Sequence, residues 1–332
     1  MDNPGPTGPG LFGLPVPAGN RRSVLVGPRR TAIELGSVPS VGVGQVLVRV
    51  RHNGICASDL HGWEAGPPAG GPYYFGHEPV GEVVETGPGV GELRPGDQVT
   101  GRLAQSMADL VVAEQIDVVR LPPGVPAASA LGEPLGCVVE GLRRTRIDVA
   151  DRVAIVGAGF MGLCLLQVLR HSWTSQIVAI DPRADAREAA LSHGADIAVG
   201  PDEAKSCLPF LGQPDTAFDV VFEASGSQPG LDLGTELVRE HGTLSILGYH
   251  QAPRTVDMKA WNFKALDVVN AHVRDRSRMR ESVARGLRLM ATGRVDLATL
   301  ITHRFALDQV DRAFEALATK PTGFIKAVVD LV

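Results

Sequence analysis

Apolar residues in the first 148 positions occur in short runs that are separated by turns rather than in long periodic segments. Gly- and Pro-rich turns, such as Gly87–Gly89 and Pro95–Asp97, separate runs that have the β-branched composition of strands. Three such runs are Val46–Val50, Val80–Glu85 and Leu110–Val112. The pattern predicts a mostly β domain over residues 23–148. Residues 1–22, rich in Gly and Pro, are expected to form a disordered tail.

The pattern changes near Asp148, where strand-like runs begin to alternate with helical periodicity. An apolar strand is predicted at Arg152–Val156, and a helix at Phe160–His171 follows it. The alternation continues with strands at Ile177–Asp181, Asp219–Glu223, Thr243–Leu247 and Asp267–Asn270, and with helices at Arg183–His193 and Gln228–His241. Such alternation is typical of βαβ units, so residues 149–272 are predicted to form a doubly wound parallel sheet.

The last segment, residues 273–332, has a mixed pattern. Helices are predicted at Arg278–Thr292 and Asp308–Ala318, and a strand at Ile325–Leu331. This segment is expected to pack back on the first domain, so that the chain is an α/β protein.

Composition narrows the function. A length of 332 residues suggests two domains of about 150 residues each. The net charge of −5, without a Lys/Arg cluster interleaved with aromatics, argues against nucleic acid as a partner. No apolar run approaches the ~18 residues of a membrane span, so no membrane partner and a cytoplasmic location are expected. Four cysteines without a C-x-x-C pair argue against a disulfide framework.

A glycine-rich turn follows the predicted strand Arg152–Val156 and opens the next helix. The match to G-x-G-x-x-G in this context is typical of a dinucleotide site, because the glycines allow close approach of a pyrophosphate to a helix N-terminus. The predicted contacts here are Gly157, Gly159, Phe160, Met161 and Gly162.

Asp181 ends the next predicted strand, 24 residues after Gly157. An acidic side chain at this spacing accepts hydrogen bonds from the adenosine ribose and repels a 2′-phosphate, so NAD(H) is favoured over NADP(H). Alternatively, Asp181 caps the next helix, and Arg183 stacks on adenine or binds a phosphate. Further cofactor contacts are predicted at Ser225, Leu247 and Gly248.

Two turns carry metal-binding residue types. Cys56 lies in the run Gly54–His61, and His77 follows in the next turn. A catalytic zinc needs about three Cys, His or carboxylate ligands and an open position, and these turns offer a thiolate and an imidazole. Separately, each residue is as well explained as a packed side chain of the core.

Several motifs together resemble one family. They are GICASDLH at 54–61, GHEPVGEVV at 76–84, PGDQV at 95–99, EPL at 133–135, GAGFMG at 157–162 and FEASG at 222–226. Their order is similar to that of the zinc-dependent, medium-chain alcohol and polyol dehydrogenases, over about Val24–Val332. The resemblance implies a GroES-like catalytic domain joined to a Rossmann nucleotide domain.

The resemblance also implies a ligand set. Cys56 and His77 correspond to zinc ligands, and the third position, 24 residues before Gly157, is Glu133. A carboxylate there resembles the polyol branch of the family. Cys137, four residues later, is the competing soft ligand.

Four further residues receive roles from the resemblance. Glu78 lies close to the metal, and Asp59 orients His77. Ser58 takes the proton of the alcohol, and His61 passes it to solvent, as general acid–base chemistry requires. The plainer alternatives are that Ser58 and Asp59 cap a helix and that His61 is a solvated surface residue.

One family feature is missing from the sequence. The lobe that carries a structural zinc in many members has no counterpart between Val99 and Leu110, so one zinc per chain is expected. The resemblance further suggests a homodimer or homotetramer.

The expected activity is hydride transfer between NAD(H) and a secondary alcohol or ketone of a polyol, sugar or cyclitol. Pocket candidates are Trp63, Tyr249 and His272, with His250 a further candidate. The alternatives are a zinc-independent NADP(H) reductase of the same superfamily and a non-catalytic nucleotide-binding protein.

Overall fold

The chain is described by a computed structural model that covers residues 19–207 and 217–331. Most of the predicted tail, residues 1–18, lies outside the described residues. The prediction is wrong for residues 20–22, because the first strand already begins at Asn20. The Asn20 side chain donates to the carbonyl of Leu110 and accepts from its N–H, both at 2.9 Å. This pairing joins positions 90 residues apart, which local periodicity does not reveal.

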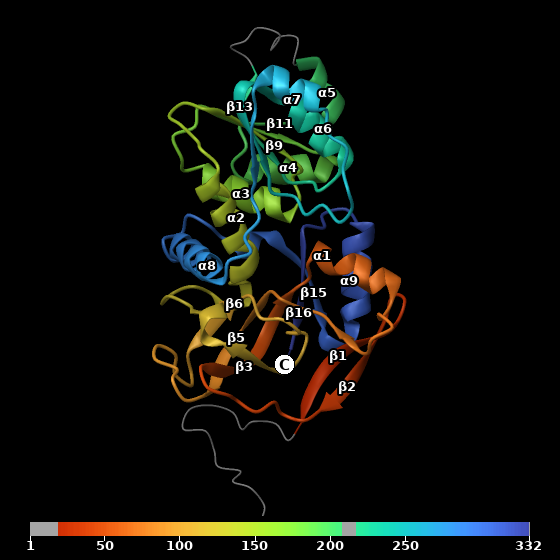
Figure 1. The fold of residues 1–332 in the computed structure, drawn as a ribbon, viewed down its shortest axis with the longest axis vertical. Coiled ribbons are helices and arrows are strands. Elements are labelled where there is room, and N and C mark those ends of the chain that lie inside the picture. Colours follow the sequence, from red (N-terminus) through yellow and green to blue (C-terminus); the bar gives the residue numbers. More distant parts are fainter. Residues whose placement is uncertain (1–18, 208–216, 332) are drawn as a thin grey trace, which may run out of the picture.

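Two sheets form the lower lobe in Figure 1. The strand order is β2-β1-β4 in one and β15-β16-β3-β5-β6-β8 in the other, where β7 also pairs with β3. The strands are β1 (Asn20–Gly27), β2 (Arg30–Gly36), β3 (Gln45–Gly54), β4 (Tyr73–Tyr74), β5 (Pro79–Thr86), β6 (Gln98–Gly101), β7 (Leu110–Glu114), β8 (Val118–Arg120), β15 (Ile301–Ala306) and β16 (Lys326–Asp330).

The end of the chain completes this lobe. Strand β16 pairs antiparallel with β3, which places Val328 opposite Gly54. Helix α9 (Val310–Thr319) lies against α1 (Ala57–Ala65), where the rings of Trp63 and Phe314 stack at 5.4 Å. The C-terminal strand therefore runs beside the turn that carries Cys56.

A six-stranded parallel sheet forms the upper lobe (Figure 1), with the order β11-β10-β9-β12-β13-β14. Its strands are β9 (Arg152–Val156), β10 (Gln176–Ile180), β11 (Ile197–Val199), β12 (Phe218–Glu223), β13 (Val238–Ile246) and β14 (Asp267–Asn270). Its helices are α3 (Phe160–Leu169), α4 (Ala184–His193), α5 (Pro201–Cys207), α6 (Gln228–Leu237) and α7 (Met258–Lys264).

The order of the strands locates the ligand crevice. The chain leaves β9 toward β10 and later crosses back to β12 on the opposite side of β9. Ligands of open α/β sheets bind at such a switch, beyond the carboxyl ends of the strands. The prediction of a mostly β domain and a doubly wound parallel sheet is confirmed. The predicted domain boundaries near 148 and 272 stay predictions.

The helix predicted at Gln228–His241 is too long. Helix α6 ends at Leu237, and strand β13 begins at the next residue. Val238 is completely buried and pairs with Phe218 of β12, so tertiary pairing overrides the local helical pattern.

Helices α2 (Gly132–Arg144) and α8 (Arg276–Ala291) pack together between the lobes (Figure 1). Helix α2 has no counterpart in the pattern analysis. Buried Glu140 of α2 contacts Arg278 and Ser282 of α8, and also Arg143. This network ties α2, which carries Glu133, to the C-terminal segment.

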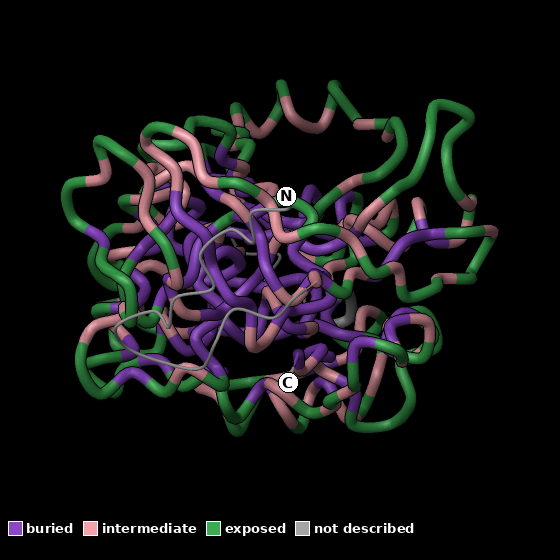
Figure 2. Tube along the Cα trace, turned by 90° about the horizontal axis from the view of Figure 1, so that it is seen from below, coloured by how far each residue is buried: buried purple, intermediate pink, exposed green. Residues whose placement is uncertain are grey.

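Buried residues occupy the middle of the molecule, and exposed loops surround them (Figure 2). Short 3₁₀ turns complete the described elements, at Gln115–Asp117, Ala127–Ser129, Leu297–Leu300 and Leu307–Gln309. None of the helices in the described ranges is both long and apolar enough to cross a membrane.

Candidate active site

Three ligating side chains converge below the seam between the lobes. Cys56 is the N-cap residue of α1, directly after β3, and His77 and Glu78 lie in the turn between β4 and β5. The candidate ligand atoms of these three residues all lie within 4.8 Å of one another. Gly76 permits the tight turn because its φ is +97° and a Cβ there would clash with Asn53 and Met107.

The His77 ring is held from both sides. Its Nδ1 lies 3.3 Å from Oδ2 of Asp59 in α1, and the orienting role of Asp59 stays a prediction. Burial lowers the pKa of His77, but the interactions with Asp59 and with Cys56 outweigh burial and raise it to about 12.

Glu78 is almost completely buried, and Lys326 of β16 balances its charge. Lys326 Nζ lies 2.6 Å from Glu78 Oε2 and donates a hydrogen bond to the carbonyl of Ile55 at 2.8 Å. Oε2 itself accepts no aligned hydrogen bond. The sequence analysis missed Lys326. A lysine inside the apolar run Ile325–Leu331 was the signal that could have found it.

Glu133 lies in the first turn of α2 and is 8% exposed. Its Oε1 accepts a hydrogen bond from the Cys137 thiol at 3.5 Å, one helical turn away. Burial raises the pKa of Glu133, whereas the nearby charge of His77 lowers it. Burial and the Glu133 carboxylate raise the pKa of the Cys137 thiol well above its usual value. Glu133 thus lies close to His77 but outside the tight group of three.

The donor set fits a zinc ion. Zinc–ligand bonds of about 2.0–2.3 Å place ligand atoms at most about 4.6 Å apart, and the candidate atoms of Cys56, His77 and Glu78 all lie within 4.8 Å of one another. Sulfur, nitrogen and oxygen donors together are typical of zinc. Oε2 of Glu78 already lies 2.6 Å from the Lys326 ammonium, so Glu78 is the carboxylate whose charge is balanced within the protein.

The predicted proton path begins beside this cluster. Ser58 donates a hydrogen bond to Cys56 Sγ at 3.3 Å. His61 is one helical turn further along α1 and is exposed. No hydrogen bond between Ser58 and His61 is present among the described residues.

The glycine-rich turn is open where a dinucleotide has to approach. Gly157 has φ +104°, and a Cβ there would lie 2.8 Å from the N of Ser225. A Cβ on Gly162 would lie 2.0 Å from the carbonyl oxygen of Gly157, so helix and strand pack closely. By contrast, Gly159, the N-cap of α3, faces open space. Free N–H groups and an open cradle fit a pyrophosphate.

Asp181 follows β10 and lies beside the glycine-rich turn. Its carboxylate accepts from the N–H of Ala158 and from the N–H of Arg183, both at 2.9 Å. The guanidinium of Arg183 is 3.5 Å from the same carboxylate. The alternative in which Asp181 caps the next helix does not describe this geometry. The carboxylate of Asp181 instead bonds to two turns, the glycine-rich turn and the turn after β10.

Glu223 organises the later cofactor turns. Its side chain is completely buried and accepts from the N–H of Ser225 at 2.8 Å, and its carbonyl accepts from the N–H of Leu247 and Gly248. His250 lies 2.8 Å from its other oxygen. Sequence analysis treated Glu223 as part of a motif without a role; its position at the end of β12 was the available signal.

Phe160 and Met161, the two remaining residues of the glycine-rich motif, have different surroundings. Lys326 lies 4.5 Å above the Phe160 ring, which links the glycine-rich turn to the buried Glu78 charge pair. Met161 is half-buried against the apolar core of the upper lobe.

The pocket candidates separate into two groups. Trp63 is 3% exposed, and its indole N–H donates to Asp311 at 2.8 Å, so it is a packing residue of the lower lobe. Tyr249 and His272 pack edge-on at 5.9 Å in the upper lobe. Tyr73, which the sequence analysis missed, interacts electrostatically with Asp59, His77 and Tyr249, and burial raises the pKa of its phenol.

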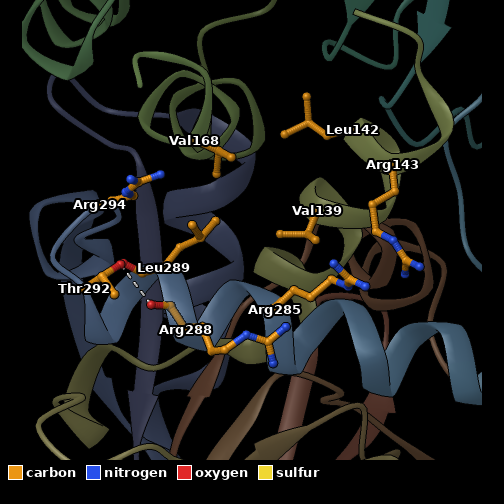
Figure 3. Close-up of a pocket in the computed structure, with 9 residues that line it drawn as sticks. All are labelled: Val139, Leu142, Arg143, Val168, Arg285, Arg288, Leu289, Thr292 and Arg294. Carbon is orange, nitrogen blue, oxygen red and sulfur yellow. Dashed lines mark hydrogen bonds between the residues drawn. The ribbon is translucent and has the colours of Figure 1, made fainter. Parts of the chain in front are cut away.

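A cavity of about 700 Å³ lies elsewhere, between α2, α3 and α8 (Figure 3). Its lining contains no carboxylate, thiol or imidazole. It is lined by Val139, Leu142, Val168, Leu289 and Thr292, with Arg143, Arg285, Arg288 and Arg294 around them. We therefore place the candidate active site at Cys56 and not at this cavity.

Known proteins match the chain in both lobes. The family model described as alcohol dehydrogenase GroES-like domain matches residues 42–123, and zinc-binding dehydrogenase matches residues 161–288. A sorbitol dehydrogenase of Halalkalibacterium halodurans is 29% identical over 320 residues, covering 86% of this chain and 92% of that protein. An L-threonine 3-dehydrogenase of Pyrococcus horikoshii is 30% identical over 322 residues, covering 86% and 91%.

Solved structures agree. Alcohol dehydrogenase TADH from Thermus sp. ATN1 has a TM-score of 0.82 at 26% identity and covers 94% of this chain and all of that one. With both domain models matched and 30% identity across most of its length, the chain belongs to the zinc-dependent, medium-chain dehydrogenase family and is an oxidoreductase.

Proposed function

We propose that the protein is a zinc-dependent dehydrogenase that transfers hydride between NAD(H) and a secondary alcohol of a polyol, sugar or cyclitol. The observation that carries the proposal is the convergence of Cys56, His77 and buried carboxylates next to an open glycine-rich turn. Two contacts join these parts: Gln251 donates to the carbonyl of Ala57 at 2.6 Å, and Lys326 lies over Phe160.

Cys56, His77 and Glu133 are the proposed zinc ligands. Lys326 pairs with Glu78, which leaves Glu133 as the carboxylate without a lysine partner. A thiolate and a carboxylate together balance the charge of Zn²⁺ and give a neutral site. Glu78 then lies beside the metal, and Asp59 holds the His77 ring.

Bound zinc lowers the pKa of an alcohol, and bound nicotinamide accepts the hydride. The chain supplies the proton path. Ser58, at the start of α1, removes the hydroxyl proton, and exposed His61 passes it to solvent one turn further along the helix. In the structure Ser58 donates to Cys56 Sγ, so its hydroxyl has to turn toward the substrate.

NAD(H) is the proposed cofactor because Asp181 places a carboxylate at the end of β10, where an adenosine ribose binds. Ser225, Leu247 and Gly248 line the neighbouring turns around Glu223. Their N–H groups donate to the side chain or the main-chain carbonyl of buried Glu223. These hydrogen bonds keep the cofactor crevice in a fixed shape.

A polyol suits the surroundings of the cluster. The charges of Asp59 and His77 act on the Tyr73 phenol, so Tyr73 is a polar group in the surroundings of the cluster that a hydroxyl-rich substrate can use. The sorbitol dehydrogenases among the relatives support the same class.

The test combines bound-metal analysis with NADH formation followed at 340 nm. The substrates are polyols, cyclitols, L-threonine and simple alcohols. We expect one zinc per chain and turnover with a polyol or cyclitol. Turnover without zinc would favour the zinc-independent reductase, and binding of NAD without turnover on any substrate would favour a non-catalytic nucleotide-binding protein.

A further inference from the structure

Two turns from different lobes contact each other at the adenosine end of the proposed cofactor site. Residues 320–325 join α9 to β16, and residues 181–183 join β10 to α4, whose first turn carries Asp185. The N–H of Gly323 donates to Asp185 Oδ2 at 2.7 Å, and Arg183 Nη1 donates to the carbonyl of Phe324 at 3.5 Å. The lower lobe therefore contacts the turn that carries Asp181.

Lys320 occupies an unusual place in this contact. It is the C-cap of α9 with φ +45°, in the left-handed region that glycine usually occupies at a helix end. Non-glycine residues in this region are strained, and such strain clusters at functional sites.

The Lys320 ammonium has no hydrogen-bond or ion-pair partner among the described residues, although two charged groups lie near it. Its charge interacts with Arg183 and with Asp181. Burial lowers the pKa of Lys320, and the repulsion from Arg183 adds to this effect, while Asp181 opposes it. Arg183 thus lies 3.5 Å from the carboxylate of Asp181, and the charge of Lys320 acts on both groups.

The other carboxylate of the turn is engaged elsewhere. Asp185 accepts from the N–H of Gly323 through Oδ2 and from the N–H of Ala186 through Oδ1. Asp181 holds the N–H groups of Ala158 and Arg183. The side chain of Lys320 is the charged group here that is free to meet a ligand.

We propose that Lys320, delivered by the catalytic lobe, contacts the adenosine ribose at its 2′ position and determines how strongly the enzyme discriminates between NAD(H) and NADP(H). This inference rests on the proposed function as a dinucleotide-dependent dehydrogenase. Asp181 favours the 2′-hydroxyl, since a carboxylate repels a phosphate. Lys320, with Arg183 beside it, favours a 2′-phosphate through a charge-assisted contact. Discrimination against NADP(H) is therefore weaker than Asp181 alone would produce.

The experiment measures dissociation constants for NADH and NADPH by fluorescence titration of the zinc-loaded full chain at fixed ionic strength. This readout does not depend on turnover. The variants are Lys320→Gln, Lys320→Arg and Lys320→Gly, with Lys259→Gln as a matched loss of one exposed lysine charge on α7.

We expect Lys320→Gln to weaken NADPH binding by about tenfold and NADH binding by less than about twofold, because one charge-assisted contact is lost. Lys320→Arg keeps most of the NADPH affinity, and Lys259→Gln changes neither constant. Lys320→Gly is the sharpest variant, because glycine fits the left-handed position. We expect this variant to lose NADPH affinity as Lys320→Gln does, while its melting temperature stays the same or rises.

Equal weakening of both cofactors in Lys320→Gln would overturn the inference, since it indicates a contact outside the 2′ position or a loss of structure. Unchanged constants for both cofactors would overturn it as well. If the unaltered protein binds neither cofactor, the proposed function fails together with the inference. If it binds both and turns over no alcohol, the substrate proposal fails, and the Lys320 comparison still decides the inference.

Discussion

At the scale of single residues, the choice between Glu133 and Cys137 decides the metal site. The two side chains share a hydrogen bond across one helical turn, so either could face the zinc. We expect Glu133→Ala to lose zinc and turnover. We expect Cys137→Ala to retain both, because the thiol is the hydrogen-bond donor and the carboxylate the acceptor. Zinc content and rate are measured on both purified variants.

The reverse result, in which only Cys137→Ala loses zinc, would show that the thiol is the ligand and would weaken the polyol assignment. A Glu78→Gln variant tests whether Glu78, the remaining carboxylate of the cluster, is itself a zinc ligand. If Glu78 lies beside the metal rather than on it, the variant keeps zinc but loses the charge that balances Lys326.

His61 tests the proton path at the same scale. We expect His61→Ala to lower turnover by about 10²-fold, mostly at low pH, because deprotonation of the alcohol is hardest there. The measurement is a pH–rate profile against the unaltered enzyme. His171, also an exposed histidine, serves as the control position. A profile of unchanged shape would exclude His61 from the mechanism.

At the scale of elements, the contact between α2 and α8 fixes the helix that carries Glu133. Glu140 is completely buried and accepts from Arg278, Arg143 and Ser282. We expect Glu140→Ala to lower the free energy of unfolding by about 2 kcal/mol, below the range for fully buried pairs because Arg278 is half exposed. Denaturant unfolding measures the change.

Glu281 on α8 is the matched control, since it also pairs with Arg143 but is exposed. Its replacement by alanine is expected to lower the free energy of unfolding much less than Glu140→Ala, because water screens an exposed ion pair. Equal effects of the two substitutions would show that burial of Glu140 contributes nothing to the contact between the helices.

At the scale of the whole molecule, strand β14 is one of the two edges of the parallel sheet, the other being β11, in the part of the chain that the structure describes. Val268 is 37% exposed on this strand, and Phe263 of the preceding helix is 81% exposed. An unpaired edge with apolar side chains is a template for another chain. We expect a homo-oligomer in which β14 contacts a second copy of the chain. We expect the Val268→Lys variant to be monomeric, as measured by light scattering. A strict monomer of the unaltered chain at micromolar concentration would contradict this expectation.

The sequence by itself determined the features that depend on local spacing. Apolar runs predicted the central strands of both lobes, such as β3, β5 and β9, but not β1, β2 or β15, and the position of Gly157 between a strand and a helix predicted the open turn before α3. These features follow from steric limits within a few residues, so a single chain displays them. Cys56 and His77 were found in the same way, through short motifs on turns.

Only the tertiary structure decided which distant side chains meet. Lys326 contacts Glu78 across 248 positions, Asn20 begins a strand by bonding Leu110, and α6 ends where Val238 pairs with Phe218. Likewise, Gly323 in the turn after α9 donates to Asp185 at the start of α4, 138 positions away. Such contacts depend on how whole elements pack, and the free energy of burying a charge or pairing a strand is set by that packing rather than by neighbours in the chain.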